Sequence, residues 1–330
     1  MKKITSFIIT ALLLLSGFSA HAQFIPASGV SVALSPKFPK PSESVTVSVE
    51  SFSTDLNQAM IGWTVNGALQ KKGAGLKSFI IEAGAFGSIT SVDIRIDTLD
   101  LGPVTKKILI IPGNIDIFEQ ADSFTPPFYK GKGLTPTEST VTLTAKPNLI
   151  NQSGRKLGND EIVFTWRKSG RVLGNDSGVG KNTLSIQAGR IPQEVISIGL
   201  EAKSISGETT VSQDYLFSSH SPEIIFYENS PLKGVDLDKA LTSPFNLKSD
   251  EVELVAIPYF FEKSLVERSE TSYSWRINNV TVSGTDNQRN VLTLRKPTVS
   301  GSSDISLSIE NVSRLFAQVS KSLRITFQNQ

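Results

Sequence analysis

Hydrophobic and polar residues alternate in short runs along most of the chain. Residues 44–51 (SVTVSVES) and 91–98 (SVDIRIDT) are clear examples, because nearly every second position is apolar. A period of two places neighbouring side chains on opposite faces of a β-strand. Turn-forming residues separate the runs, and no helical period is seen after residue 22. The pattern predicts an all-β protein.

Three of these runs form strand–turn–strand patterns, and each contains one of the three tryptophans, Trp63, Trp166 and Trp275. A two-residue hairpin turn needs residues that tolerate positive φ. The turn residues in the three runs are Asn66-Gly67, Ser169-Gly170 and Asn278-Asn279. The tryptophans lie 103 and 109 positions apart, which is the length of one β-sandwich. We expect each tryptophan to be the buried core anchor of one sandwich.

A second repeat supports this organisation. GAGLKSFIIEAG at residues 73–84 is matched closely by GVGKNTLSIQAG at residues 178–189. A chain of 330 residues suits two or three domains of about 100 residues. We therefore predict three tandem immunoglobulin-like β-sandwiches after a signal peptide. The predicted boundaries are 1–22 for the signal peptide, then 23–111, 112–219 and 220–330.

The first 22 residues have the pattern of a cleaved secretory signal. Lys2 and Lys3 are followed by an apolar run at residues 7–15 and by the small-residue site Ala20-His21-Ala22. The apolar run is too short to cross a membrane, which takes about 20 residues. We expect a mature chain that starts near Gln23, has no membrane span, and is secreted, periplasmic or on the cell surface.

The composition limits the chemistry of the mature chain. Without Lys2 and Lys3, 31 basic residues face 31 acidic ones, so the charge pattern of a nucleic-acid-binding protein is missing. The absence of cysteine excludes disulfides, so packing alone must hold the cores. The one remaining histidine, His220, lies in the joint before Pro222, where we interpret it as a linker residue. These counts exclude Cys–His pairs and multi-histidine zinc sites, and we predict no enzyme and no cofactor.

Two acidic loops are candidate calcium-binding sites. Asp236-Leu237-Asp238 and Asp55-Leu56-Asn57 could offer carboxylate oxygens, but the full calcium-loop motif is absent. Ordinary Asx turns are the preferred interpretation of both loops.

The densest aromatic cluster is Tyr259-Phe260-Phe261. These rings are either packed within or between domains, or exposed as a stacking platform for a sugar or peptide. The loops that precede the tryptophan strands differ in length, since Val45, Val141 and Val252 lie 18, 25 and 23 residues before the next tryptophan. Sandwiches carry recognition in such end loops, so these loops are candidate binding elements.

Three segments carry a resemblance to a known domain type: TDLNQAMIGWTVNG at residues 54–67, FTWRKSG at 164–170 and YSWRINN at 273–279. Together with the G-x-G turn and the strand ending in Ala-Gly, they resemble bacterial Ig-like and PKD-like extracellular domains. The Gly-Asp-Gly that usually follows the tryptophan in PKD domains is missing, which favours the Ig-like label. The resemblance implies spacers, adhesins or surface-assembly proteins without catalytic residues.

The sequence therefore predicts a non-enzymatic, exported structural or adhesive protein of the bacterial cell surface or periplasm, associated with pili or surface assembly. Its partner would be a protein or glycan at the cell surface, whose identity the sequence leaves open. The alternative is a soluble extracellular protein that recognises glycan or peptide through the loops before the tryptophan strands.

Overall fold

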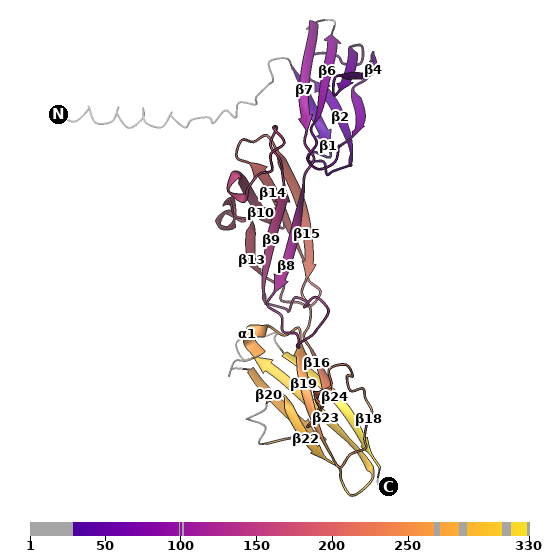
Figure 1. Cartoon of the computed structure of the whole chain (residues 1–330), viewed down its shortest axis with the longest axis vertical. Coiled ribbons are helices and arrows are strands. Elements are labelled where there is room, and N and C mark those ends of the chain that lie inside the picture. The colour runs from indigo at the N-terminus through magenta and orange to yellow at the C-terminus, as the bar shows by residue number, and fades with distance from the viewer. Residues whose placement is uncertain are drawn as a thin grey trace, which may run out of the picture. The chain divides into compact units, whose positions relative to one another are not determined.

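In the computed structural model of the chain, the regular secondary structure consists almost entirely of β-strands (Figure 1). Contacts divide it into two compact units. The first unit contains the described residues up to Lys37 together with Glu43–Ala83 and Thr90–Ile110, and the second contains the remainder. The predicted signal peptide, residues 1–22, lies outside the described residues. The structure describes residues 29–98, 100, 102–266, 271–283, 289–311 and 318–328.

The first unit is a two-sheet sandwich around Trp63, which is 0% exposed. Its hairpin turn has the predicted conformation, with φ of 49° at Asn66 and 83° at Gly67. One sheet has the order β1 (Val30–Ser35), β2 (Ser44–Ser51), β5 (Ser78–Glu82). The other has the order β4 (Ala68–Ala74), β3 (Met60–Val65), β6 (Thr90–Thr98), β7 (Gly102–Ile110).

The second sandwich repeats this arrangement around Trp166. One sheet has the order β13 (Thr183–Gln187), β9 (Thr140–Asn148), β8 (Asn114–Ala121). The other has the order β11 (Arg171–Val172), β10 (Ile162–Lys168), β14 (Val195–Ser204), β15 (Thr210–Ser218), and β12 (Gly178–Val179) also pairs with β10. The 3₁₀ turn Gly174–Asp176 interrupts the ladder beside Trp166. The Ser177 hydroxyl fills the gap, accepting from Trp166 N at 3.0 Å and donating to Leu173 O at 2.7 Å.

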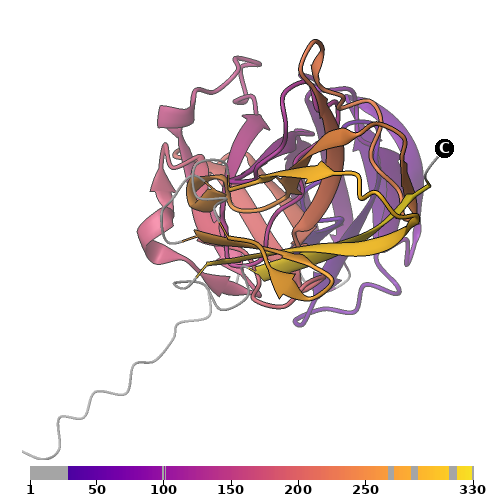
Figure 2. The same cartoon turned by 90° about the horizontal axis from the view of Figure 1, so that it is seen from below.

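The third sandwich has the same two layers, which can be followed by their orange and yellow strands in Figure 2. One sheet has the order β17 (Gly234–Val235), β16 (Glu223–Ser230), β19 (Glu251–Tyr259), β22 (Val291–Arg295). The other has the order β18 (Phe245–Leu247), β24 (Gln318–Phe327), β23 (Gly301–Asn311), β20 (Thr271–Ile277), β21 (Val280–Thr281).

Strand β18 pairs in parallel with β24 at the edge of its sheet. One feature of the third sandwich differs from the sequence-based expectation. The helix α1 (Lys263–Val266) contradicts the expectation that no helix follows residue 22. One turn of helix is too short to show a helical period in the sequence.

All three sandwiches share one strand order. One sheet contains β1-β2-β5 in the first sandwich, β8-β9-β13 in the second and β16-β19-β22 in the third, and the tryptophan hairpin always lies in the other sheet. This confirms the predicted fold class: all-β, with three tandem immunoglobulin-like sandwiches. Three separate hydrophobic cores correspond to them, and two of these cores lie within the second compact unit. The residue boundaries between sandwiches stay a prediction.

The residues that follow each hairpin supply a hydrogen-bond acceptor for the buried tryptophan. All three tryptophans are 0% exposed, and a buried indole N–H needs a partner. The acceptors are the backbone oxygens of Leu76, Lys181 and Arg289, at 2.9, 2.9 and 3.0 Å. Each acceptor lies two residues before a strand, namely β5, β13 and β22. In the first two copies a glycine with positive φ, Gly75 or Gly180, immediately precedes it.

Candidate functional site

Strand β19 is buried on both of its faces. Val252, Leu254 and Ala256 belong to the core of the third sandwich. Val255, Ile257 and Tyr259 form a second apolar cluster with Tyr227 of β16. A strand that is apolar on both faces must be covered on both. The partly buried residues that pack on the second cluster are Phe124, Ile225, Val235, Leu237, Phe260 and Val291.

The three rings of the predicted aromatic cluster are divided between these two faces. Phe261 is 1% exposed and lies in the sandwich core. Tyr259 is 7% exposed and belongs to the outer cluster, where the half-buried Phe260 packs against it. Phe260 has φ of 55°, an uncommon conformation for a bulky residue. The structure therefore brings Tyr259 and Phe260 together and separates Phe261 from them.

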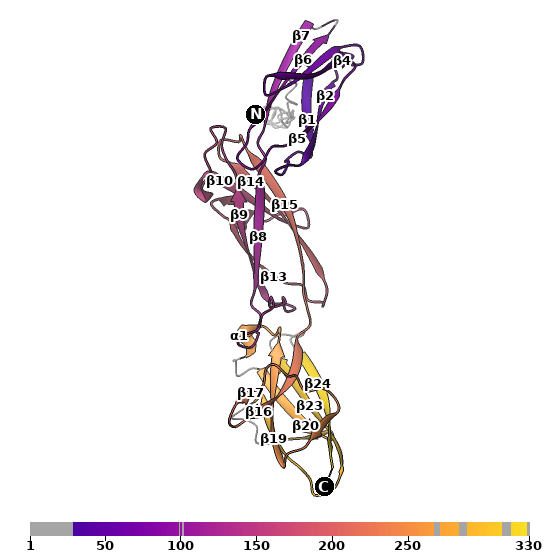
Figure 3. The same cartoon turned by 45° about the vertical axis from the view of Figure 1, so that its right-hand side comes forward.

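The outer cluster is covered by residues 122–137, which connect β8 to β9 and which we call the strap. Figures 1 and 3 both show the chain after β8 passing beside α1. Phe124 N donates to Phe261 O at 2.7 Å, and Phe260 N donates to Phe124 O at 2.8 Å. Ser264 N donates to a carboxylate oxygen of Asp122 at 3.4 Å. The strap is thus hydrogen-bonded through its backbone to the end of β19.

Tyr129 of the strap adds a ring contact to both residues of the outer cluster. Its ring centroid lies 5.8 Å from that of Tyr259 and 5.9 Å from that of Phe260, with interplanar angles of 70° and 72°. These are edge-to-face contacts, which aromatic pairs prefer over direct stacking. The Tyr227 and Tyr259 hydroxyl oxygens lie 2.7 Å apart. Burial, together with this hydrogen bond, raises the pKa of Tyr259, so its hydroxyl stays protonated.

The other end of the strap is held by Glu119 of β8, whose side chain is 6% exposed. Lys132 Nζ, Thr135 Oγ1 and Tyr215 OH each donate to this carboxylate at 2.7 Å. Burial raises the pKa of Glu119, but these hydrogen bonds, with the charge of Lys132, outweigh it and leave the pKa below its ordinary value. Burial and the bond to Glu119 raise the pKa of Tyr215 to about 12.

His220, which the sequence placed in the joint, also contacts the strap. Its backbone N donates to Thr135 O at 2.8 Å, and Thr137 N donates to its carbonyl oxygen at 3.2 Å. The side chain is half-buried, and its Nδ1 atom has no hydrogen-bond partner among the described residues. The strap is therefore bonded to both sandwiches and to the segment that connects them.

The carboxylate of Glu119 should make stability depend on pH. Its folded-state pKa is lowered from 4.5, so its contribution is complete above the unfolded-state pKa and is lost as pH falls through the folded-state value. We expect the free energy of unfolding of the full chain to decline below about pH 4.5. Glu119→Gln should be less stable at neutral pH and should show a shallower decline. Urea titrations between pH 7 and 3 would measure this, and equal declines in both proteins would contradict the assignment.

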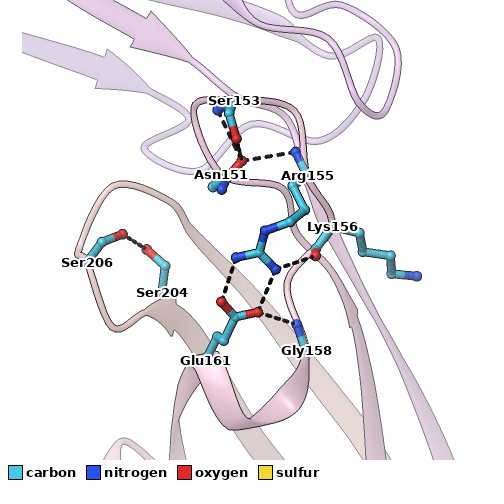
Figure 4. A network of polar contacts seen from close by, with 8 residues as sticks. All are labelled: Asn151, Ser153, Arg155, Lys156, Gly158, Glu161, Ser204 and Ser206. Carbon is cyan, nitrogen blue, oxygen red and sulfur yellow. Dashed lines mark hydrogen bonds and ion pairs between the residues drawn. The ribbon is translucent and has the colours of Figure 1, made fainter.

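The loop before Trp166, a candidate binding element, is fixed by polar contacts (Figure 4). Asn151 Oδ1 accepts from Ser153 N, Ser153 Oγ and Arg155 N at 3.0, 2.7 and 2.9 Å. The Arg155 guanidinium donates to both oxygens of Glu161 at 2.9 and 2.6 Å. Hydrogen bonds from Arg155 and from Gly158 N lower the pKa of Glu161 to about 2. Beside the loop lies a groove of about 450 Å³, lined in part by Phe118, which is 58% exposed.

The acidic loops differ in their local structure. Asp55 Oδ1 accepts from Asn57 N at 2.9 Å and from Asn57 Nδ2 at 2.8 Å, which is an Asx turn. Asp236 and Asp238 are exposed beside the strap. Within the described part of the chain, no group of three or more His, Cys, Asp or Glu residues is placed to hold a metal ion.

Solved structures of other multidomain proteins show a distant similarity to this chain. The three N-terminal domains of the bacteriophage RB49 highly immunogenic outer capsid protein match 92% of this chain and 98% of their own at 10% identity, with a TM-score of 0.25. The central fibronectin-III array of RIM-binding protein matches 91% and 96% at 11% identity, with a TM-score of 0.29. Sidekick-1 immunoglobulin domains 1–4 match 91% and 75% at 12% identity, with a TM-score of 0.22.

The strand order of its sheets makes the chain a tandem array of immunoglobulin-like domains. No protein-family model matches the sequence, and no curated protein matches it. None of the helices in the described residues has the length and apolar character needed to cross a membrane.

Proposed function

We propose that this is an exported, non-enzymatic structural or adhesive protein of the bacterial cell surface or periplasm, associated with pili or surface assembly. Its tandem sandwiches would serve as spacers, and the strap would make the second and third sandwiches move as one body. The observation that carries the proposal is the reciprocal backbone pairing of Phe124 with Phe260 and Phe261.

The strap supports a spacer role because it restricts the relative motion that is usual between tandem domains. Relative motion is the default for domains joined by a short linker unless their interface is large and hydrophobic. Here the strap forms backbone hydrogen bonds and ring contacts with the third sandwich. Its Lys132 and Thr135 donate to the buried Glu119 carboxylate of the second sandwich. A spacer must keep its ends at a fixed separation, and an unstrapped joint would bend.

Removing the backbone pairing should release the joint. Phe124→Pro eliminates the N–H that bonds to Phe261 O, as well as the ring. The chain has no native cysteine, so spin labels can be placed at Ser212→Cys in β15 and Ser322→Cys in β24. We expect a narrow distance distribution between the labels in the otherwise native protein and a clearly broader one in Phe124→Pro. Pulsed electron paramagnetic resonance measures both distributions.

Phe124→Ala is the matched control, because it removes the ring and keeps the backbone donor. It should broaden the distribution less than Phe124→Pro does. A broad distribution in the native background would contradict the proposal that the two sandwiches form one structural unit.

A second candidate function is recognition of glycan or peptide through the loop before Trp166. The observation in its favour is the groove beside that loop, where the exposed ring of Phe118 adjoins a segment held by the Arg155–Glu161 pair. A fixed loop loses little conformational entropy on binding.

A further inference from the structure

A cleft of about 1110 Å³ opens where the strap meets the third sandwich. It is lined by strap residues 126–130 and by residues 233–238, which include β17. Tyr259 of β19, a member of the ring cluster described above, also lines it. This volume is slightly above the usual range of small-molecule sites, about 300–1000 Å³. The groove beside the Trp166 loop is separate from this cleft and shares no lining residue with it.

The strap residues of the cleft expose aromatic surface to water. Phe128 is 94% exposed and has φ of 64°, whereas the neighbouring Tyr129 is 38% exposed. A bulky residue at positive φ is strained, and a fully exposed ring gains nothing from burial. Folding alone therefore gives no reason for a phenylalanine at position 128. An exposed ring at the mouth of a cleft can instead stack on the apolar face of a ligand.

The charged groups of the cleft are mixed in sign. Glu228, Asp236 and Asp238 contribute three carboxylates, and Lys130 and Lys233 contribute two ammonium groups. None of the five forms an ion pair within the described residues. The carboxylates would repel a polyanion, and the lysines would repel a polycation. A neutral ligand rich in hydroxyl groups avoids both conflicts, because hydroxyls can donate to carboxylates and accept from ammonium groups.

We propose that this cleft binds a neutral oligosaccharide, with Phe128 as its stacking surface and the carboxylates and lysines as hydrogen-bonding partners for sugar hydroxyls. The proposed site adds a binding activity to the structural role and does not depend on it. Apart from Tyr259, its lining residues lie outside the segments that precede the tryptophan strands.

The test is isothermal titration of the full mature chain with soluble neutral oligosaccharides at millimolar concentration: β-1,4-linked glucose, α-1,4-linked glucose, mannose and N-acetylglucosamine oligomers. An oligogalacturonate and an oligolysine peptide serve as charged probes. We expect at least one neutral oligomer to bind saturably and to bind more tightly than either charged probe. Phe128→Ala should weaken this binding about tenfold or more, with no change in melting temperature, because the ring is exposed.

Two exposed phenylalanines provide matched controls: Phe52 of the first sandwich, 101% exposed, and Phe118 of the groove beside the Trp166 loop. Phe52→Ala and Phe118→Ala should bind like the unmodified protein. The proposal is overturned if no neutral oligomer binds, if a charged probe binds more tightly, or if Phe128→Ala binds normally. Loss of binding in Phe118→Ala alone would also overturn it and would favour the second candidate function.

Discussion

Trp166→Ala is expected to lower the free energy of unfolding of the second sandwich by about 3–5 kcal/mol. The indole is 0% exposed, so its removal leaves a large cavity among packed side chains. The substitution also leaves Lys181 O without the N–H that it accepts from at 2.9 Å. Such a loss is a large part of the roughly 5–15 kcal/mol that stabilises a typical domain.

Urea denaturation of the full chain, followed by circular dichroism, would measure this loss. Trp63 and Trp275 remain as fluorescent reporters of the other two sandwiches. Leu216→Ala is a suitable control because Leu216 lies on β15 of the same sandwich and is 64% exposed. It should change stability by no more than about 0.5 kcal/mol. An unchanged midpoint in Trp166→Ala would mean that Trp166 is not the core anchor.

Phe261→Ala should destabilise the third sandwich by about 3–5 kcal/mol. Phe261 is 1% exposed and packs in the same core as Trp275. Its backbone oxygen, which accepts from Phe124 N, is kept in the variant. The loss should therefore come from the cavity and not from the strap.

Phe260→Ala separates core packing from strap packing. Phe260 is half-buried and contacts Tyr129 of the strap and Tyr259, so we expect a loss of about 1 kcal/mol, mainly the value of its ring contacts. Denaturant titrations of both variants, compared with the unmodified chain, give the two values. Equal losses would contradict the division of the three rings between two faces of β19.

The division of these rings had a signal in the sequence. Residues 254–261, LVAIPYFF, are continuously apolar, whereas the corresponding strands in the other sandwiches alternate, as in residues 44–51. A continuous apolar run is typical of a strand covered on both faces. The run could have predicted that something covers β19. It could not have shown that the cover is Phe124 and Tyr129, because they lie more than 120 residues earlier in the chain.

The site at Glu119 had no such signal. Its partners Lys132 and Tyr215 are separated from it by 13 and 96 residues, and an isolated glutamate in a strand is ordinarily solvated. Its role arises only when β8, β15 and the strap enclose the carboxylate. The cleft beside Phe128 is similar, since its two main lining segments are about 100 residues apart in the sequence.

The sequence by itself determined the strands, the hairpin turns and the tryptophans on which each core is built. These follow from local rules: a period of two, residues that tolerate positive φ, and the length of one sandwich. Only the tertiary structure decided which carbonyl accepts from each indole, where the strap goes and which aromatic side chains stay exposed. Those contacts join residues far apart in the chain, and their formation depends on the packing of surfaces that exist only after each sandwich has folded.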